Sequence, residues 1–288
     1  MTDPRLTAVV VTHNRRSPLL STLAHLRGDA VPVIVVDNGS TDGTAEAVAE
    51  RFPEVEVVRS ERNLGAAGRN LGVERASTPY VAFNDDDSWW APGALHRAAD
   101  LFDHFPRLGL IAARVEVGPE RAVDPTSAAM AASPIPPQPD LPGPPVLGFL
   151  ACGAVVRRSA YLAVGGFCEL LFFFGEETVL ALDLAQAGWG LAYVDDVVAY
   201  HHPPPRADGG GRRRLAVRNH LLGTWMRRPA RRAVHATARA VAAAPRDAEV
   251  RRGVLDALGS LVEALRQRRV IDPELDHHLH LLEVANRR

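Results

Sequence analysis

Three consecutive aspartates, Asp85, Asp86 and Asp87, follow an apolar segment that begins at Tyr80. At a separation of about 4 Å and an effective dielectric near 20, each pair of like charges costs about 4 kcal/mol. The carboxylates therefore turn into water, share a proton or bind a cation. Hard oxygen ligands at the end of a buried strand suit Mg²⁺ or Mn²⁺, especially when substrate phosphates share the ion. Residues 80–92 alone leave a solvated acidic turn open as the alternative.

Two further groups have side chains that could act with these aspartates. Glu176 and Glu177 begin a helical pattern, where carboxylates complement the helix dipole, so a plain helix cap is the simpler interpretation of that pair. His201 and His202 follow a predicted strand and could bind a metal or be incidental.

Composition excludes several classes of protein. The 288 residues contain two cysteines, Cys152 and Cys168, too few for a disulfide framework. No apolar run approaches the roughly 20 residues that span a bilayer. The first residues show no charged and then apolar leader, so we expect a cytoplasmic protein, with peripheral contact at the inner face of the membrane left open.

The charges divide the chain into two unequal parts. Residues 1–202 contain 15 arginines and 25 acidic residues, whereas residues 203–288 contain 18 arginines and 9 acidic residues, and there is no lysine. A basic helical tail either contacts an anionic surface or packs on its own acidic domain. We expect no nucleic-acid partner, while membrane contact and a homodimer stay open.

Strands and helices alternate in the first part of the chain. β-branched apolar runs predict buried strands at residues 6–12, 33–36, 55–59 and 80–84, with helices between them. This order predicts an α/β fold with a mostly parallel, doubly wound sheet. A further strand is expected at 108–117, followed by a long surface loop at 118–145. The tail predicts helices at 212–226, 230–243, 248–268 and 273–284.

Ligands of such sheets bind beyond the carboxyl ends of the strands. This rule brings together the polar residues that follow each predicted strand, and we expect one crevice lined by Thr12, Asn14, Arg15, Asp37, Asn38, Arg69 and the three aspartates. The turn after the first strand reads THNR instead of a Gly-rich phosphate loop, which argues against a dinucleotide-dependent hydride transfer.

The most specific feature of the sequence is a set of seven motifs that follow one another along the chain. They are VVVTHNR, VVDNGSTDGT, NLGAAGRN, VAFNDDDSWWAPGAL, GGFCE, GEE and AYHH. Over about residues 5–202 the chain resembles the inverting family 2 glycosyltransferases of bacteria, which have the GT-A fold, and among them the rhamnosyl- and galactofuranosyltransferases. The resemblance implies a transferase domain at 1–204, with a nucleotide-binding half (1–105) and an acceptor-binding half (106–204), and an Arg-rich helical extension at 205–288.

The resemblance also implies roles for individual residues. Glu177 stands where the family supplies its general base, with Glu176 as the second candidate. Asp87 and Asp85 would bind Mn²⁺ or Mg²⁺ together with His201, or with His202 in its place. The residues implied in binding the nucleotide sugar are Thr12, Asn14, Arg15, Asp37, Asn38, Arg69, Asp85 and Asp86.

The implied reaction is metal-dependent transfer of a sugar, with inversion, from a UDP, dTDP or GDP sugar to the hydroxyl of an unidentified acceptor. A sugar-phosphate nucleotidyltransferase and a non-catalytic sugar-nucleotide-binding protein are the alternatives. The chain departs from the family at Val179, where an acid is frequent, at Asp183, where an arginine is common, and at Cys168, which replaces an aspartate.

Overall fold

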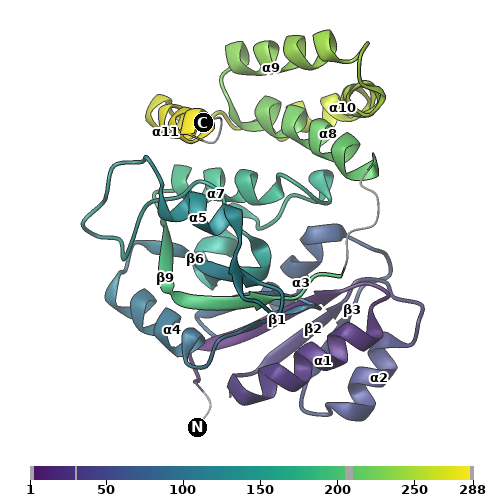
Figure 1. Ribbon diagram of the computed structural model, residues 1–288, viewed down its shortest axis with the longest axis vertical. Helices are drawn as coiled ribbons and strands as arrows, with labels where there is room; N and C mark the ends of the chain where they lie inside the picture. The colour runs from purple at the N-terminus through teal and green to yellow at the C-terminus, as the bar shows by residue number, and fades with distance from the viewer. Residues whose placement is uncertain (1–2, 30, 205–209, 286–288) are drawn as a thin grey trace.

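A nine-stranded sheet with helices on both faces forms the body of the protein (Figure 1). The computed structural model describes residues 3–29, 31–204 and 210–285. The strands are β1 (Leu6–Thr12), β2 (Val33–Asp37), β3 (Glu56–Arg59), β4 (Tyr80–Asp85), β5 (Ser88–Trp90), β6 (Leu108–Val117), β7 (Ala122–Val123), β8 (Ala154–Arg157) and β9 (Gly190–His201). The helices are α1 (Arg16–Leu26), α2 (Thr44–Arg51), α3 (Gly68–Arg75), α4 (Ala94–His104), α5 (Pro125–Ala131), α6 (Arg158–Val164), α7 (Glu176–Gln186), α8 (Gly210–Arg227), α9 (Ala230–Ala243), α10 (Ala248–Arg266) and α11 (Pro273–Ala285).

The predicted α/β fold is confirmed, and its parallel part lies in the first half of the chain. The strand order is β3-β2-β1-β4-β8-β6-β9-β5, with β7 paired to β6. β1 runs parallel to both β2 and β4, and β2 runs parallel to β3. β8 is antiparallel to β4 and β6, so the second half is mixed, although β6 and β9 are parallel. The first four strands therefore end at one edge of the sheet.

Alternate side chains of β1 enter separate cores on the two faces of the sheet. Ala8 and Val10 face one core and Val9 and Val11 the other, and all four are buried. On the second face, α3 lies close against the sheet because Gly72 has no side chain; a Cβ there would lie 2.4 Å from Val9 Cγ1. This close approach fixes the helix that carries Arg69.

Residues 118–145 differ from the predicted surface loop. They include β7 and α5, and Met130, Ile135 and Leu141 are buried. The prediction was wrong because the prolines and alanines concealed a short helix, which Asp124 caps by accepting a hydrogen bond from the Thr126 N–H. Residues 190–201 form the single long strand β9, whose pairing with β6 has an irregularity between Ala113 and Arg114.

The four predicted helices of the tail are present. Helices α8 and α11 pack on α7, and α7 lies between these two helices and the sheet (Figure 1). Val179 of α7 shares a small apolar core with Leu222 and Val254 of the tail. Arg227 and Asp183 form an almost buried ion pair between α8 and α7, with Nη2 2.8 Å from Oδ2. At least part of the tail's positive charge is thus neutralised within the protein. None of the helices in the described ranges is long and apolar enough to cross a bilayer.

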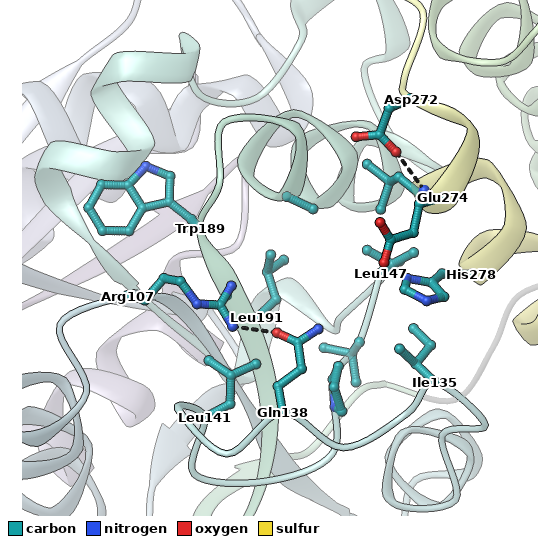
Figure 2. Close-up of a pocket in the computed structure, with 15 residues that line it drawn as sticks. Arg107, Ile135, Gln138, Leu141, Leu147, Trp189, Leu191, Asp272, Glu274 and His278 are labelled. Atoms are coloured by element: carbon teal, nitrogen blue, oxygen red, sulfur yellow. Dashed lines mark hydrogen bonds between the residues drawn. The ribbon is translucent and has the colours of Figure 1, made fainter.

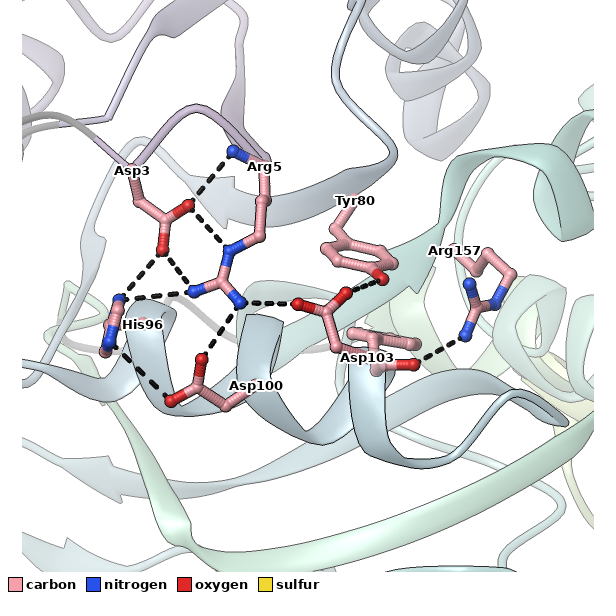
Figure 3. A network of polar contacts seen from close by, with 8 residues as sticks. Asp3, Arg5, Tyr80, His96, Asp100, Asp103 and Arg157 are labelled. Atoms are coloured by element: carbon pink, nitrogen blue, oxygen red, sulfur yellow. Dashed lines mark hydrogen bonds and ion pairs between the residues drawn. The ribbon is translucent and has the colours of Figure 1, made fainter.

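An ion-pair network lies at the amino ends of β1 and β4 (Figure 3). Arg5 contacts the carboxylates of Asp3, Asp100 and Asp103 at 2.8, 2.9 and 2.6 Å. The Tyr80 hydroxyl donates a hydrogen bond to Asp103. These groups join α4 to the sheet at the edge opposite the three aspartates, so we assign the network a structural role.

Candidate active site

The acidic turn connects the carboxyl end of β4 to β5, and its middle aspartate is buried. Asp86 accepts hydrogen bonds from Thr12 Oγ1 at 2.9 Å and from Arg15 Nε at 2.6 Å. The Thr22 hydroxyl donates to the Asp86 carbonyl oxygen. Burial raises the pKa of Asp86 to about 6, although Arg15 opposes the shift. Asp86 thereby anchors the turn to β1 and α1.

Asp87 connects the turn to the last strand of the sheet. Its carboxylate lies 2.8 Å from Arg15 Nη2 and 3.3 Å from His201 Nε2. The His202 N–H donates to the Asp87 carbonyl oxygen at 2.8 Å, and its ring packs against Trp89. The imidazole that faces Asp87 is therefore that of His201.

Asp85 contacts a buried arginine and belongs to a group of three side chains that could hold a metal ion. Arg69 of α3, only 1% exposed, donates to the Asp85 carboxylate, but its Nε and Nη1 have no partner among the described residues. Asp85, Cys152 and His201 bring one ligand atom each within 4.8 Å of one another, the only such group of three found in the described ranges. Burial raises the pKa of the Cys152 thiol, and its soft sulfur suits Mn²⁺ or Mg²⁺ less well than oxygen ligands do. Carboxylates and an imidazole remain, a donor set that fits Mn²⁺ or Mg²⁺.

The residues expected to bind the nucleotide end β1 and β2. Asp37 pairs with Thr12 in the strand register, as Asp85 pairs with Val11, so all three lie at the same edge. Asp37 is buried, and its carboxylate accepts a hydrogen bond from the Ser40 N–H at 2.9 Å.

Asn14 and Asn38 organise turns of the backbone. Asn14 has a positive φ of 53° and accepts a hydrogen bond from the Thr41 N–H at 2.8 Å. Asn38 accepts from the Leu64 N–H and donates to the Gly65 carbonyl oxygen, both at 2.9 Å. Because the turn at 63–65 leads into the helix of Arg69, Asn38 positions that arginine.

Glu176 and Glu177 begin α7. The positive charge of Arg69, which bonds to Asp85, also acts on both glutamates. Burial, followed by repulsion from Glu177, raises the pKa of Glu176 to about 8. Burial also raises the pKa of Glu177, Arg69 lowers the pKa of both glutamates, and Asp85 raises that of Glu177. Glu176 is 2% exposed and its Oε2 has no partner among the described residues, whereas Glu177 is half-buried. We infer that Glu176 keeps a proton at neutral pH and that Glu177 is the ionised member.

The shifted pKa of Glu176 predicts how stability depends on pH. In the unfolded chain its pKa is near 4.5, so between about pH 4.5 and 8 the folded protein holds a proton that the unfolded chain releases. Stability therefore falls as pH rises through this range, by at most about 1.4 kcal/mol per pH unit from this group. We expect Glu176→Gln to flatten the dependence. Urea denaturation at pH 5.5 and 7.5 measures it, with Glu169→Gln as the control. Equal slopes for Glu176→Gln and the parent would contradict the assignment.

The loop that precedes α7 holds the two glutamates in place. Phe172 and Phe174, just before α7, have positive φ values of 62° and 71°. Such conformations cost about 1–3 kcal/mol each in residues other than glycine. Asn219 of α8, 1% exposed, stabilises them by donating through its amide nitrogen to the carbonyl oxygens of Leu171, Phe173 and Phe174. The tail thus shapes the loop that precedes the acidic pair.

Removal of this amide should loosen the loop. We expect Asn219→Ala to cost about 1–3 kcal/mol of stability, the usual penalty for polar groups that lose a partner. Asn219→Asp should cost more, because a carboxylate would face three carbonyl oxygens. Hydrogen exchange of residues 171–175 and the melting temperature measure both effects. Parental exchange in both variants would show that the loop does not depend on Asn219.

The cavity in Figure 2 lies away from these residues. Its volume is about 280 Å³, and Arg107, Gln138 and Trp189 line it together with Glu274 and His278 of α11. Arg107 precedes β6 and Trp189 precedes β9, so the cavity is at the amino ends of strands that run in the same direction as β4. It therefore opens at the sheet edge opposite the acidic turn and is not part of the candidate site.

The sheet, the acidic turn at its carboxyl edge and the nearby acidic pair define a GT-A glycosyltransferase. Solved structures share the fold. One is the mannosyltransferase PcManGT from Pyrobaculum calidifontis in complex with GDP-Man and Mn²⁺, with a TM-score of 0.60, 21% identity and coverage of 98% of this chain and 76% of that one. Another is S. aureus TarS 1–349 in complex with UDP-GlcNAc, with a TM-score of 0.63, 16% identity and coverage of 98% and 88%.

Sequence comparison gives the family. Residues 7–165 match the family described as Glycosyl transferase family 2. An N-acetylglucosaminyl-diphospho-decaprenol L-rhamnosyltransferase of Mycobacterium tuberculosis is 30% identical over 230 residues, which are 67% of this chain and 74% of the relative. A pre-mycofactocin glycosyltransferase of the same organism is 32% identical over 196 residues, 65% of this chain and 40% of the relative. The chain belongs to glycosyl transferase family 2 and is a nucleotide-sugar glycosyltransferase. The glycosyltransferase assignment sets the nucleotidyltransferase and non-catalytic alternatives aside.

Proposed function

We propose that the protein transfers a sugar from a nucleoside-diphosphate sugar to an acceptor hydroxyl by one metal-assisted displacement with inversion. The observation that carries the proposal is the position of Arg69. This buried arginine donates to Asp85 in the acidic turn and lowers the pKa of Glu176 and Glu177. The expected donor site and the expected base thus meet around one guanidinium.

The carboxyl edge of the sheet would bind the donor. Thr12, Asn14 and Asp37 lie where the base and ribose would bind, and Asn38 would act through the turn that leads to Arg69. Two N–H groups of Arg69 lack partners among the described residues and suit ribose or phosphate oxygens. Arg15 and Asp86 would hold the turn in register for the donor. The base is open between UDP, dTDP and GDP.

Asp85, Asp87 and His201 would hold Mn²⁺ or Mg²⁺. The complex of PcManGT with GDP-Man and Mn²⁺ supports a divalent ion. When bound, such an ion supplies Lewis-acid stabilisation of the charge that develops on the departing diphosphate. The distance of 3.3 Å between His201 and Asp87 supports His201 over His202 as the third ligand.

Glu177 would take the proton from the attacking hydroxyl. It is the ionised member of the pair, and burial brings its pKa closer to neutral, where a general base works best. Glu176, with its proton, would position Glu177. Attack from the face opposite the leaving diphosphate gives inversion in one step.

A thermal-shift screen tests donor binding. UDP, dTDP and GDP sugars are tested with and without Mn²⁺ on the full chain. A ligand present at 100 times its Kd stabilises the folded protein by about 2.7 kcal/mol. We expect one nucleotide family to raise the melting temperature, and to do so more with Mn²⁺. No shift with any of them at millimolar concentration would count against the proposal.

We further propose that the tail contacts an anionic membrane surface at the cytoplasmic face. Helix α10 presents Leu255, Leu258, Val262 and Leu265, each 43–64% exposed, at helical spacing, with the exposed Arg251 near them. An apolar stripe with cations beside it suits the interface of an anionic bilayer. Flotation with anionic liposomes at low salt tests this contact, and sedimentation tests the alternative of a homodimer. A monomer that does not float would rule out both.

A further inference from the structure

A second cavity opens beside the acidic pair, between α7, α8 and α11. Its volume is about 300 Å³, the lower end of the range for small-molecule sites. Phe174 and Gly175 line it just before the two glutamates, and Thr178, Val179 and Leu182 line it along α7 just after them. The cavity therefore extends along α7 from the point at which the proposed base is held.

Several polar side chains of this cavity are engaged within the protein, although Nη2 of Arg228 has no partner among the described residues. Asn219 donates to the loop carbonyl oxygens, and the Thr224 hydroxyl donates to the His220 carbonyl oxygen at 2.7 Å. Arg228 bonds to Asp276 of α11 at 2.7 Å and also to Glu283. Desolvation lowers the pKa of His220, which leaves its ring neutral at neutral pH. A ligand would thus meet mostly apolar surface, from Phe174, Val179, Leu182, Ala216 and Leu279.

The loop that ends at Phe174, a residue of the cavity wall, adds exposed aromatic surface. Phe172, Phe173 and Phe174 are 37%, 40% and 38% exposed, although burial of a phenylalanine side chain is favourable. Two of the three also have strained backbone conformations, which the bonds from Asn219 offset. A loop held in a costly conformation that exposes apolar groups beside a reactive carboxylate indicates a binding surface.

We propose that this cavity binds an alkyl or prenyl group of the acceptor, next to the hydroxyl that receives the sugar. The inference rests on the proposed function, because it assigns Glu177 to the acceptor side. Binding of the apolar group along α7 would bring the neighbouring hydroxyl to Glu177 at the amino end of the helix. The apolar group then contributes affinity and positioning, and the chemical step stays with the polar residues.

Alkyl glucosides test the proposal directly on the full chain. The probes are hexyl, heptyl and octyl β-D-glucopyranoside, each below its micelle concentration, with methyl β-D-glucopyranoside as the control without a chain. Saturation-transfer NMR should show contact at the alkyl protons. Affinity should rise about fourfold for each further methylene that becomes buried. Equal binding of the methyl and octyl probes would overturn the proposal.

A substitution that fills the cavity provides the matched variant. Ala216 is an exposed residue of α8 on the cavity wall, so Ala216→Phe should occupy the space without disturbing the core. We expect at least a tenfold loss of affinity for the octyl probe and no change in the thermal shift by sugar nucleotides and Mn²⁺. Ala238→Phe, at an exposed position of α9, should leave both measurements unchanged.

The alkyl-binding and nucleotide measurements distinguish a failure of the cavity assignment from a failure of the proposed function. Parental octyl binding by Ala216→Phe, or no alkyl signal from the parent, would overturn the cavity assignment while the nucleotide shift still supports a transferase. Alkyl binding that Ala216→Phe removes, without any nucleotide shift in the parent, would support the cavity as an apolar site and count against the proposed function. Loss of a dimer in Ala216→Phe, without alkyl binding, would assign the surface to a second copy and overturn the proposal.

Discussion

Glu177→Gln is expected to lower the rate of sugar transfer by a factor of about 10²–10⁴, the usual contribution of a general base. Glutamine keeps the size and hydrogen-bonding capacity of the side chain but cannot accept the proton of the acceptor hydroxyl. Donor binding should remain close to that of the parent, because the residues proposed to bind the nucleotide lie at the ends of β1, β2 and β4. Steady-state kinetics and the nucleotide thermal shift together separate the two effects.

Two other glutamates serve as comparisons for Glu177→Gln. Glu169→Gln makes the same chemical change at an exposed glutamate that pairs with Arg62, and transfer should stay at the parental rate. Glu176→Gln should retain more activity than Glu177→Gln, because Glu176 already holds a proton at neutral pH. Parental transfer by Glu177→Gln would remove this residue from the role of base. A larger loss in Glu176→Gln would exchange the two assignments.

Asp87→Asn should weaken the response of the protein to Mn²⁺ by a factor of about 10–100 or more, since even residues behind the ligands of a metal site have effects of that size. The substitution removes the charge that faces both Arg15 and His201. Mn²⁺ titration with and without the sugar nucleotide, followed by the thermal shift, measures the change. Transfer should fall in parallel, because less charge on the leaving diphosphate would be stabilised.

Asp100→Asn is the control for this titration, since that aspartate belongs to the network at the opposite edge of the sheet (Figure 3). It should leave the metal response unchanged. An Asp87→Asn protein that responds to Mn²⁺ and the nucleotide like the parent would refute the metal assignment. An unchanged response in Asp87→Asn combined with a lost response in His201→Ala would move the site toward Asp85 and His201.

The fold of residues 1–105 could be predicted from the sequence because its signals are local. Each of its strands is a short apolar run, and its helices have helical spacing and clear boundaries, as in α2 at Thr44–Arg51. The rule for parallel sheets then places Thr12, Asp37 and Asp85 at one edge, which the strand register confirms. Their roles in binding and catalysis remain predictions.

The contribution of the tail could not be predicted, because it depends on contacts between distant parts of the chain. No local pattern distinguishes Asn219 from other polar residues of a helix, yet it bonds to three carbonyl oxygens more than 40 residues away. The departures from the family have the same physical origin. Val179 packs in the core that α7 shares with α8 and α10, Asp183 pairs with Arg227, and Cys168 Sγ lies 3.4 Å from Gln267 Oε1.

The junction between α7 and the terminal helices limits how this protein can be re-engineered. A chimaera that receives the last four helices of another transferase would lose Arg227, the partner of Asp183. It would also lose Asn219, whose amide bonds to the backbone before Glu176. An almost buried carboxylate that loses its partner typically costs several kcal/mol, so such a hybrid would lose stability and the shape of its reaction centre together. A successful exchange would have to transplant positions 168, 179 and 183 with the helices, as one module.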